Sequence, residues 1–220
     1  PPEHAPPAPP PAPLDHTTPP PLLERLRDAH QFRSRSGERS LSRIHATNRD
    51  LGWIPGIGEA LIEYVPGEST SPMFGGNSNW RGPVWLPTNY SLVSSLERFY
   101  RFLGDGFTVP VPCLGGEHRN LREIASLIAE RLADLYRHHQ QPAVPALAGR
   151  CPSAEDPYWR DLFWFFEYFH ADSGQGLGAA HQTGWTGLLA NLVMRRYQKD
   201  IQPWSGLDSG KKPALIDEIA

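Results

Sequence analysis

The chain has 220 residues, of which 39% are hydrophobic and 20% charged, and a formal net charge of −3. This composition fits one ordinary globular domain and excludes a fibrous or wholly disordered protein. The slightly acidic balance argues against a protein dedicated to nucleic acid or to an anionic membrane surface. No run of residues approaches the roughly 20 apolar residues that span a bilayer, so we expect neither nucleic acid nor membrane as a partner.

The two cysteines, Cys113 and Cys151, are too few for a disulfide framework, and their spacing matches no metal motif. Their scarcity favours a reducing compartment, so we expect a soluble, cytoplasmic protein. The sequence contains no Walker loop, HExxH or GxSxG pattern. We therefore expect no metal and no cofactor.

Proline marks the start of the chain, because 11 of the 24 prolines lie within residues 1–21. Such a segment buries little apolar surface, and we expect it to be disordered or extended as polyproline II. It is interpreted as a spacer or as a ligand for a proline-recognition domain. The remainder divides into a folded region, residues 22–200, and a tail, residues 201–220.

The first half of the folded region is predicted to contain two helices and a strand. Residues 21–30 resemble a short helix, and the polar stretch 33–50 has too many charges to belong to a core. Residues 57–65 are typical of a strand. Residues 88–103 have helical apolar spacing and are followed by glycines that end a helix.

Three further helices are predicted in the second half. In the first, residues 121–139, Asn120 and Glu123 complete a capping box. Residues 158–170 follow an Asp-Pro cap and are apolar almost all round, which predicts a buried helix. The last helix covers about residues 183–198. Because strands do not alternate with helices, the pattern favours an all-α fold of antiparallel helix pairs around a common centre.

The segment 73–90, MFGGNSNWRGPVWLPTNY, mixes aromatic and polar side chains unusually closely. Core packing would explain Trp80 or Trp85 alone, but not the polar residues between and beside them. Indole faces stack on the apolar side of a sugar, while amides and a guanidinium bind its hydroxyls. A nucleic-acid platform would need a surplus of positive charge. The polar candidates for a carbohydrate platform are Asn79, Arg81 and Asn89.

A second unusual segment surrounds Glu167, which stands among five aromatic residues in the sequence WFFEYF. A carboxylate in apolar surroundings costs several kcal/mol unless it is paired or has a task. One interpretation is a structural ion pair with Arg160 or Arg81. The other is a general acid or base at the end of the predicted helix.

The glycine-rich sequence after Glu167 would let backbone approach a ligand closely. It is followed by His181, Gln182 and Trp185, which add an imidazole, an amide and an indole. Taken alone, His181 is more typical of a core or capping histidine than of a catalytic one. With its neighbours it extends the candidate sugar site.

Both segments, in this order, resemble the C-terminal catalytic region of glycoside hydrolase family 63, in particular its bacterial mannosylglycerate hydrolase-like members. The resembling motifs are GGNSNWRGPVW-x-x-x-NY at 75–90, EYFHADSGQGLGAAHQTGWTGL at 167–188 and, less specifically, GERSLSRIH at 37–45. The resemblance covers about residues 31–197. It implies part of an (α/α)6 toroid, an enzyme that hydrolyses α-glucosidic or α-mannosidic bonds with inversion, and an α-linked oligosaccharide or glycoside as substrate.

The resemblance also implies roles for individual residues. Glu167 matches the general base of the family. The residues that it implies for substrate binding are Asn79, Trp80, Arg81, Trp85, Asn89, Tyr168, His181, Gln182 and Trp185.

The sequence departs from the family pattern in one respect that affects catalysis. The general acid of the family is an aspartate upstream of these motifs, and no segment of this chain matches its surroundings. A closed toroid also needs more helices than the sequence predicts. We therefore expect the C-terminal half of the barrel, with its N-terminal half missing, and little or no activity of the chain alone. The alternatives are a non-catalytic carbohydrate-binding or scaffold protein and an interaction protein that acts through its proline-rich arm.

Overall fold

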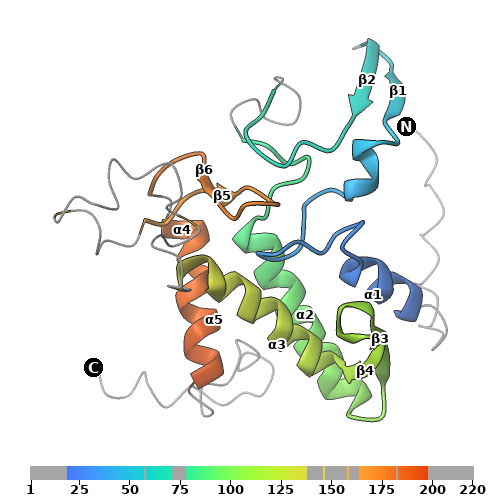
Figure 1. Cartoon of the computed structure of the whole chain (residues 1–220), viewed down its shortest axis with the longest axis vertical. Helices are drawn as coiled ribbons and strands as arrows, with labels where there is room; N and C mark the ends of the chain where they lie inside the picture. Colours follow the sequence, from blue (N-terminus) through green and yellow to red (C-terminus); the bar gives the residue numbers. More distant parts are fainter. Residues whose placement is uncertain are drawn as a thin grey trace, which may run out of the picture.

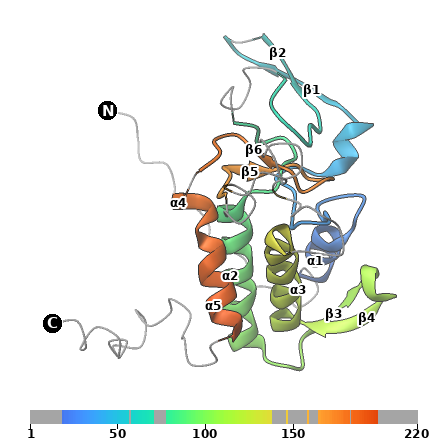
Figure 2. The same cartoon turned by 60° about the vertical axis from the view of Figure 1, so that its left-hand side comes forward.

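The computed structural model describes residues 19–56, 58–70, 78–137, 146, 158, 164–181 and 183–197. The predicted proline-rich segment, apart from its last residues, and the predicted tail lie outside these ranges. Three helices lie side by side at the centre of the molecule (Figures 1 and 2): α2 (Leu86–Leu103), α3 (Leu121–Ala133) and α5 (Leu188–Tyr197). Two more helices flank them, α1 (Pro19–Arg27) and α4 (Thr183–Thr186).

Three antiparallel sheets, each of two strands, complete the described fold. The hairpin of β1 (Asp50–Ile54) and β2 (Gly58–Ile62) extends away from the helices (Figures 1 and 2). The other pairs are β3 (Thr108–Val111) with β4 (Glu117–Asn120), and β5 (Tyr168–Phe169) with β6 (Gly176–Leu177). The described residues are thus mostly helical with small sheets, and they do not form a closed toroid. No described helix combines the length and apolar character needed to cross a bilayer.

The core is formed where α3 packs against α2 and α5. The apolar side chains of α3 recur with helical period, so this helix presents one continuous buried face. Burying each large aliphatic side chain contributes about 1.5–3 kcal/mol. The buried core residues of the three helices are Leu86, Val93, Leu96, Leu121, Ile124, Ala125, Ile128, Leu132, Ala133, Leu189 and Leu192.

The predicted start of α3 and the predicted end of α2 are confirmed, whereas α3 ends at Ala133 and the predicted helix 183–198 is divided into α4 and α5. Asn120 Oδ1 accepts from the Glu123 amide at 2.9 Å, and Glu123 Oε2 accepts from the Asn120 amide at 2.9 Å. This capping box satisfies two of the amides left free at a helix N-terminus. α2 ends at Gly104, whose φ of +73° favours glycine. The helical apolar spacing of residues 88–103 matches the buried face of α2 only in part, since Leu96 is buried but Phe99 is 45% exposed.

The predicted helix over residues 158–170 is wrong in its described part. Residues 164–170 are not helical, and Tyr168 and Phe169 form β5. β5 pairs with the nearby strand β6. On its other side, the Phe169 N–H donates to the Val84 carbonyl at 3.0 Å, and the Val84 N–H donates to the Phe169 carbonyl at 2.9 Å. A continuous apolar run fits a doubly buried strand as well as a buried helix, and the cross-chain pairing decides the outcome.

The interpretation of residues 33–50 as too charged for a core is wrong for residues 36–39, which are buried, whereas most of residues 43–49 are exposed. Glu38 and Arg39 are 5% and 7% exposed. Glu38 forms an ion pair with Arg131 of α3 at 3.2 Å, and Arg39 Nη2 lies 3.2 Å from Asp172. Charged residues are buried here because each one finds a partner on another segment.

Candidate functional site

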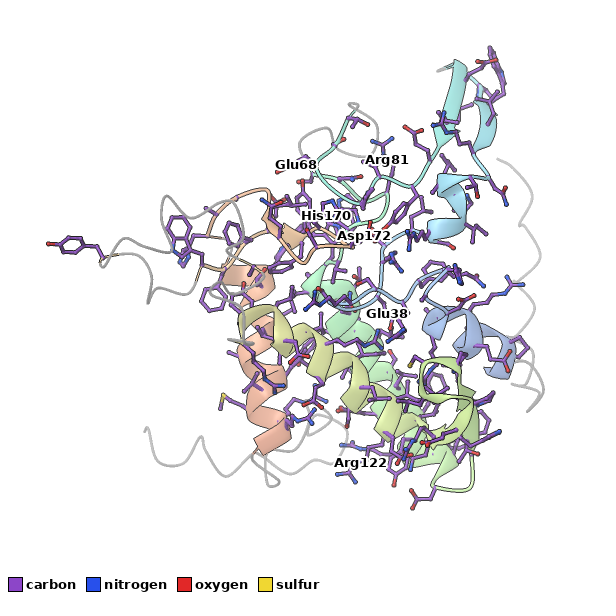
Figure 3. The ribbon with its side chains drawn as sticks, viewed as in Figure 1. Glu38, Glu68, Arg81, Arg122, His170 and Asp172 are labelled. Carbon is purple, nitrogen blue, oxygen red and sulfur yellow. The ribbon has the colours of Figure 1, made fainter. Side chains whose placement is uncertain are left out.

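The segments that carry the described site residues lie at the end of α2 and α5 where β5, β6 and α4 are found (Figure 1). Figure 3 places Glu68 and Arg81 at this end of the molecule, opposite Arg122. The contributing segments are the stretch after β2, residues 78–85, β5, the turn after β6, and α4. Residues 78–85 and β5 are joined by the antiparallel bridge between Val84 and Phe169.

An aromatic stack forms the centre of the site. Trp80 and Trp85 lie 3.9 Å apart, with ring planes only 2° from parallel, and Tyr168 covers the stack next to Trp85 at 4.5 Å. Trp185 meets Trp85 edge-on at 5.3 Å. Trp85 is fully buried, whereas Trp185 is 37% exposed and Trp80 is partly exposed. Trp80 and Trp185 are therefore the indoles that a ligand can reach, and Trp85 and Tyr168 support them.

Asn79 holds the loop on which Trp80 lies. Its Nδ2 donates to the carbonyl oxygens of Val65 and Gly67, both at 2.7 Å. Its Oδ1 accepts from the Arg81 amide at 2.9 Å, and its own carbonyl accepts from Trp85 Nε1 at 2.9 Å. The amide group of this predicted sugar-binding residue is thus used to fix the protein backbone.

Asn89 has a similar arrangement inside α2. Its Oδ1 accepts from the Glu38 amide at 2.7 Å, and its Nδ2 donates to the carbonyls of Glu38 and Trp85, both at 2.9 Å. Asn89 is 1% exposed. It therefore ties the segment around Glu38 to the start of α2.

Arg81 is buried, with 3% of its surface exposed. Its Nε and Nη2 atoms make no hydrogen bond within the part of the chain that the structure describes. A buried guanidinium with free donors is costly unless it meets an acceptor. Both atoms are buried, and a contact of Arg81 with a ligand stays a prediction.

Glu167 lies directly before β5, not at the end of a helix as predicted. Its Oε1 accepts from Ser78 Oγ at 2.6 Å, and its Oε2 accepts from the Ala179 amide at 3.2 Å. Neither of these hydrogen bonds comes from Arg81, and Arg160 lies outside the described residues. The carboxylate is half-buried and held from two sides.

Gly178 is required beside this carboxylate. Its φ is +68°, and a Cβ at this position would lie 2.5 Å from Glu167 Oε2 and 2.7 Å from Tyr168 Cε1. Any side chain here would push the carboxylate away. The glycine-rich sequence thus brings backbone close to a side chain of the protein itself, and its close approach to a ligand stays a prediction.

A second carboxylate, Glu68, was missed by the sequence analysis. Tyr168 donates its hydroxyl to Glu68 Oε2 at 2.5 Å, and the Gly178 amide donates to Glu68 Oε1 at 3.3 Å. Burial raises the pKa of the Tyr168 phenol, and the adjacent Glu68 carboxylate raises that pKa further. Glu68 lies between the recognisable motifs, and only the folded arrangement brings it to the site.

The remaining predicted residues are less closely connected. His181 is exposed, and its ring meets the edge of Phe165 with 6.1 Å between ring centres. Gln182 lies outside the described residues. In the described ranges, no group of three or more His, Cys, Asp or Glu side chains is arranged to hold a metal ion.

The chain is similar to proteins of two yeasts. No protein-family model matches the chain. The uncharacterized protein YMR196W of Saccharomyces cerevisiae is 42% identical over 174 residues, which are 78% of this chain and 16% of that protein.

Two glucosidases are more distant relatives. The mannosyl-oligosaccharide glucosidase of S. cerevisiae is 24% identical over 124 residues, and the probable mannosyl-oligosaccharide glucosidase of Schizosaccharomyces pombe is 25% identical over 122 residues. Each match covers 56% of this chain and 12% of the relative. The chain is thus distantly similar to mannosyl-oligosaccharide glucosidases, and it spans less than a fifth of the length of each of these relatives.

Proposed function

We propose that the chain is the C-terminal portion of an inverting glycoside hydrolase of family 63, which cleaves α-glucosidic or α-mannosidic bonds. The observation that carries this proposal is the position of Glu167. Its carboxylate is held by Ser78 and Ala179, beside Tyr168 and the stacked indoles of Trp80 and Trp85. A fixed carboxylate beside an aromatic sugar platform is the arrangement that a general base needs.

In this mechanism Glu167 takes a proton from the attacking water. The water adds to the anomeric carbon on the face opposite the leaving group, so the configuration inverts. The hydrogen bonds from Ser78 and Ala179 orient the carboxylate toward the water, and Trp80 binds the apolar face of the sugar. A general acid must protonate the leaving oxygen from a position about 6.5–9.5 Å away.

The general acid is proposed to come from another part of a longer protein. The distant glucosidase relatives, of which the chain matches 12%, support this division. General acid catalysis is typically worth about 10²–10⁴-fold. The 220-residue chain alone should therefore bind sugar and hydrolyse glycosides slowly or not at all.

The test compares the 220-residue chain with a longer polypeptide from the same gene that carries the upstream segment. Hydrolysis of α-glucosides and α-mannosides is measured for both, with Glu167→Gln and the hairpin control Glu63→Gln. We expect activity only in the longer polypeptide, a loss of at least about 10²-fold in Glu167→Gln, and full activity in Glu63→Gln.

Two results would contradict the proposal. Unchanged hydrolysis by the longer Glu167→Gln variant would exclude Glu167 as the base. Sugar binding by both wild-type forms, with no hydrolysis by either, would support a non-catalytic carbohydrate-binding protein instead.

A further inference from the structure

Glu68 and Glu167 are held by consecutive backbone amides of one turn. The Gly178 amide donates to Glu68, and the Ala179 amide donates to Glu167. Consecutive Cα atoms lie only about 3.8 Å apart, so the two carboxylates are neighbours although they come from distant parts of the sequence. The turn after β6 therefore places a second carboxylate beside the proposed general base.

Glu68 is also fixed to the aromatic stack. Its Oε2 accepts from the Tyr168 hydroxyl at 2.5 Å, and the ring of Tyr168 is fully buried against Trp85. The position of this carboxylate relative to the indoles is thus set by a rigid side chain. A rigid acceptor beside an aromatic platform is well suited to select the orientation of a sugar ring.

The hydrogen bonds to Glu68 also indicate its chemical role. Both described bonds are donated to it, which suits an ionised acceptor better than a proton donor. Glu68 is exposed, so a ligand can reach its carboxylate, and a carboxylate offers about four acceptor sites. Sugar hydroxyls donate to carboxylates in charge-assisted bonds that are stronger than neutral ones.

We propose that Glu68 binds hydroxyl groups of the same sugar ring that stacks on Trp80. This inference rests on the proposed function, because it assigns a further substrate-binding residue to that site. Glu167 acts on the anomeric side of the ring, while Glu68 holds its hydroxyls. The ring is thereby fixed in one orientation over the indole.

The experiment measures the affinity of the 220-residue chain for methyl α-D-glucopyranoside, methyl α-D-mannopyranoside and their monodeoxy analogues by calorimetric or NMR titration. The variants are Glu68→Gln and the matched control Glu59→Gln, which changes the same charge on the exposed hairpin. For the better-bound glycoside we expect a loss of tenfold or more in Glu68→Gln, equivalent to about 1.4 kcal/mol. Glu59→Gln should bind as the wild type does.

The monodeoxy analogues separate direct contact from a structural role. A direct contact predicts that wild type and Glu68→Gln bind one particular deoxy sugar equally, because the contacted hydroxyl is already missing. An equal loss for every deoxy sugar would overturn direct binding. If Glu68→Gln does not fold, Tyr168→Phe retains the ring and removes the bond to Glu68, and the same pattern is expected from it in weaker form.

The titration also distinguishes the two proposals. Wild-type binding that is unchanged in Glu68→Gln would overturn the role of Glu68 and leave the proposed function standing. A wild-type chain that binds neither glycoside would overturn both the role of Glu68 and the sugar platform.

Discussion

Trp80 lies flat on Trp85, with 3.9 Å between ring centres, yet only Trp80 is accessible to solvent. The two indoles should therefore respond differently to the same substitution. Trp85→Ala should lower the free energy of unfolding by about 3–5 kcal/mol, because it empties a fully buried position. Trp80→Ala should cost clearly less stability and should weaken sugar binding strongly.

Urea denaturation and sugar titration of both variants test this division. Trp80→Phe is the control, since it keeps an aromatic face and should keep part of the affinity. Equal loss of stability in both alanine variants would contradict the assignment of Trp85 as the supporting layer.

Gly178→Ala should disable the site with little effect on the helices. The substitution meets a φ of +68° and places a methyl group 2.5 Å from Glu167 Oε2. A residue with Cβ costs roughly 1–2 kcal/mol in this backbone conformation, and the carboxylate must move as well. The rate of hydrolysis by the longer polypeptide should fall by about 10²-fold or more. The free energy of unfolding is measured alongside it.

Gly184→Ala is the matched control for Gly178→Ala. Gly184 lies in α4, and no atom of the described residues lies within 4 Å of a Cβ added there. Alanine is favoured over glycine in a helix by up to about 1 kcal/mol, so activity should persist and stability should not fall. Wild-type activity in Gly178→Ala would show that the turn does not position Glu167.

Asn79→Asp should loosen the loop that carries Trp80. The substitution keeps the acceptor for the Arg81 amide but places a carboxylate oxygen against the carbonyls of Val65 and Gly67. Losing a buried donor costs about 1–3 kcal/mol, and the facing oxygens repel each other. Thermal unfolding should show a clear decrease in the midpoint.

The same substitution at Asn191 provides the control for Asn79→Asp. Asn191 Oδ1 accepts from the Tyr90 hydroxyl at 3.0 Å, a role that aspartate retains. Asn191→Asp should therefore change stability only slightly. If both variants lose the same stability, the donor role of Asn79 is not what holds the loop.

Arg131→Met should make stability depend strongly on pH. Burial raises the pKa of Glu38, and the Arg131 guanidinium opposes that increase. Removing Arg131 leaves Glu38 buried without this partner, which costs about 3–5 kcal/mol near neutral pH. Because the pKa in the folded state then lies further above the unfolded value, part of the loss should be recovered as the pH falls and Glu38 is protonated.

Chemical denaturation at several pH values tests this prediction, with Arg49→Met as the control. Arg49 pairs with Glu63 at 3.4 Å, with 63% of its side chain exposed, so its loss should cost at most about 1 kcal/mol. A loss in Arg131→Met that does not change with pH would contradict the assigned role of the buried pair.

Local chemistry made the central helices predictable from sequence. The capping box of Asn120 and Glu123 and the helix end at Gly104 depend on residues within a few positions of one another. The strand Tyr168–Phe169 pairs with Gly176–Leu177 and, through Phe169, with the backbone of Val84. The apolar run that predicts a helix ends at residue 170, so it contains neither partner.

The sequence predicted which motifs form the candidate site, but it did not predict what each residue does within the site. The sequence indicated Trp80, Trp85 and Glu167 from composition and from the family resemblance. It could not show that Asn79 bonds to the backbone, because its partners lie before the motif. Glu68 was missed for the same reason, since its contact with Tyr168 joins residues from two distant segments.

The side chain of Asn79 has a consequence for how the chain can vary in length. It bonds to the carbonyls of Val65 and Gly67, so Gly67 and Asn79, the two residues that flank the connection 68–78, are held together. Doubling the length of such a connection costs only about 0.6 kcal/mol of closure entropy. Insertions between these points should therefore be tolerated without moving Trp80, and proteins of this kind could acquire new sugar contacts there while keeping the same platform.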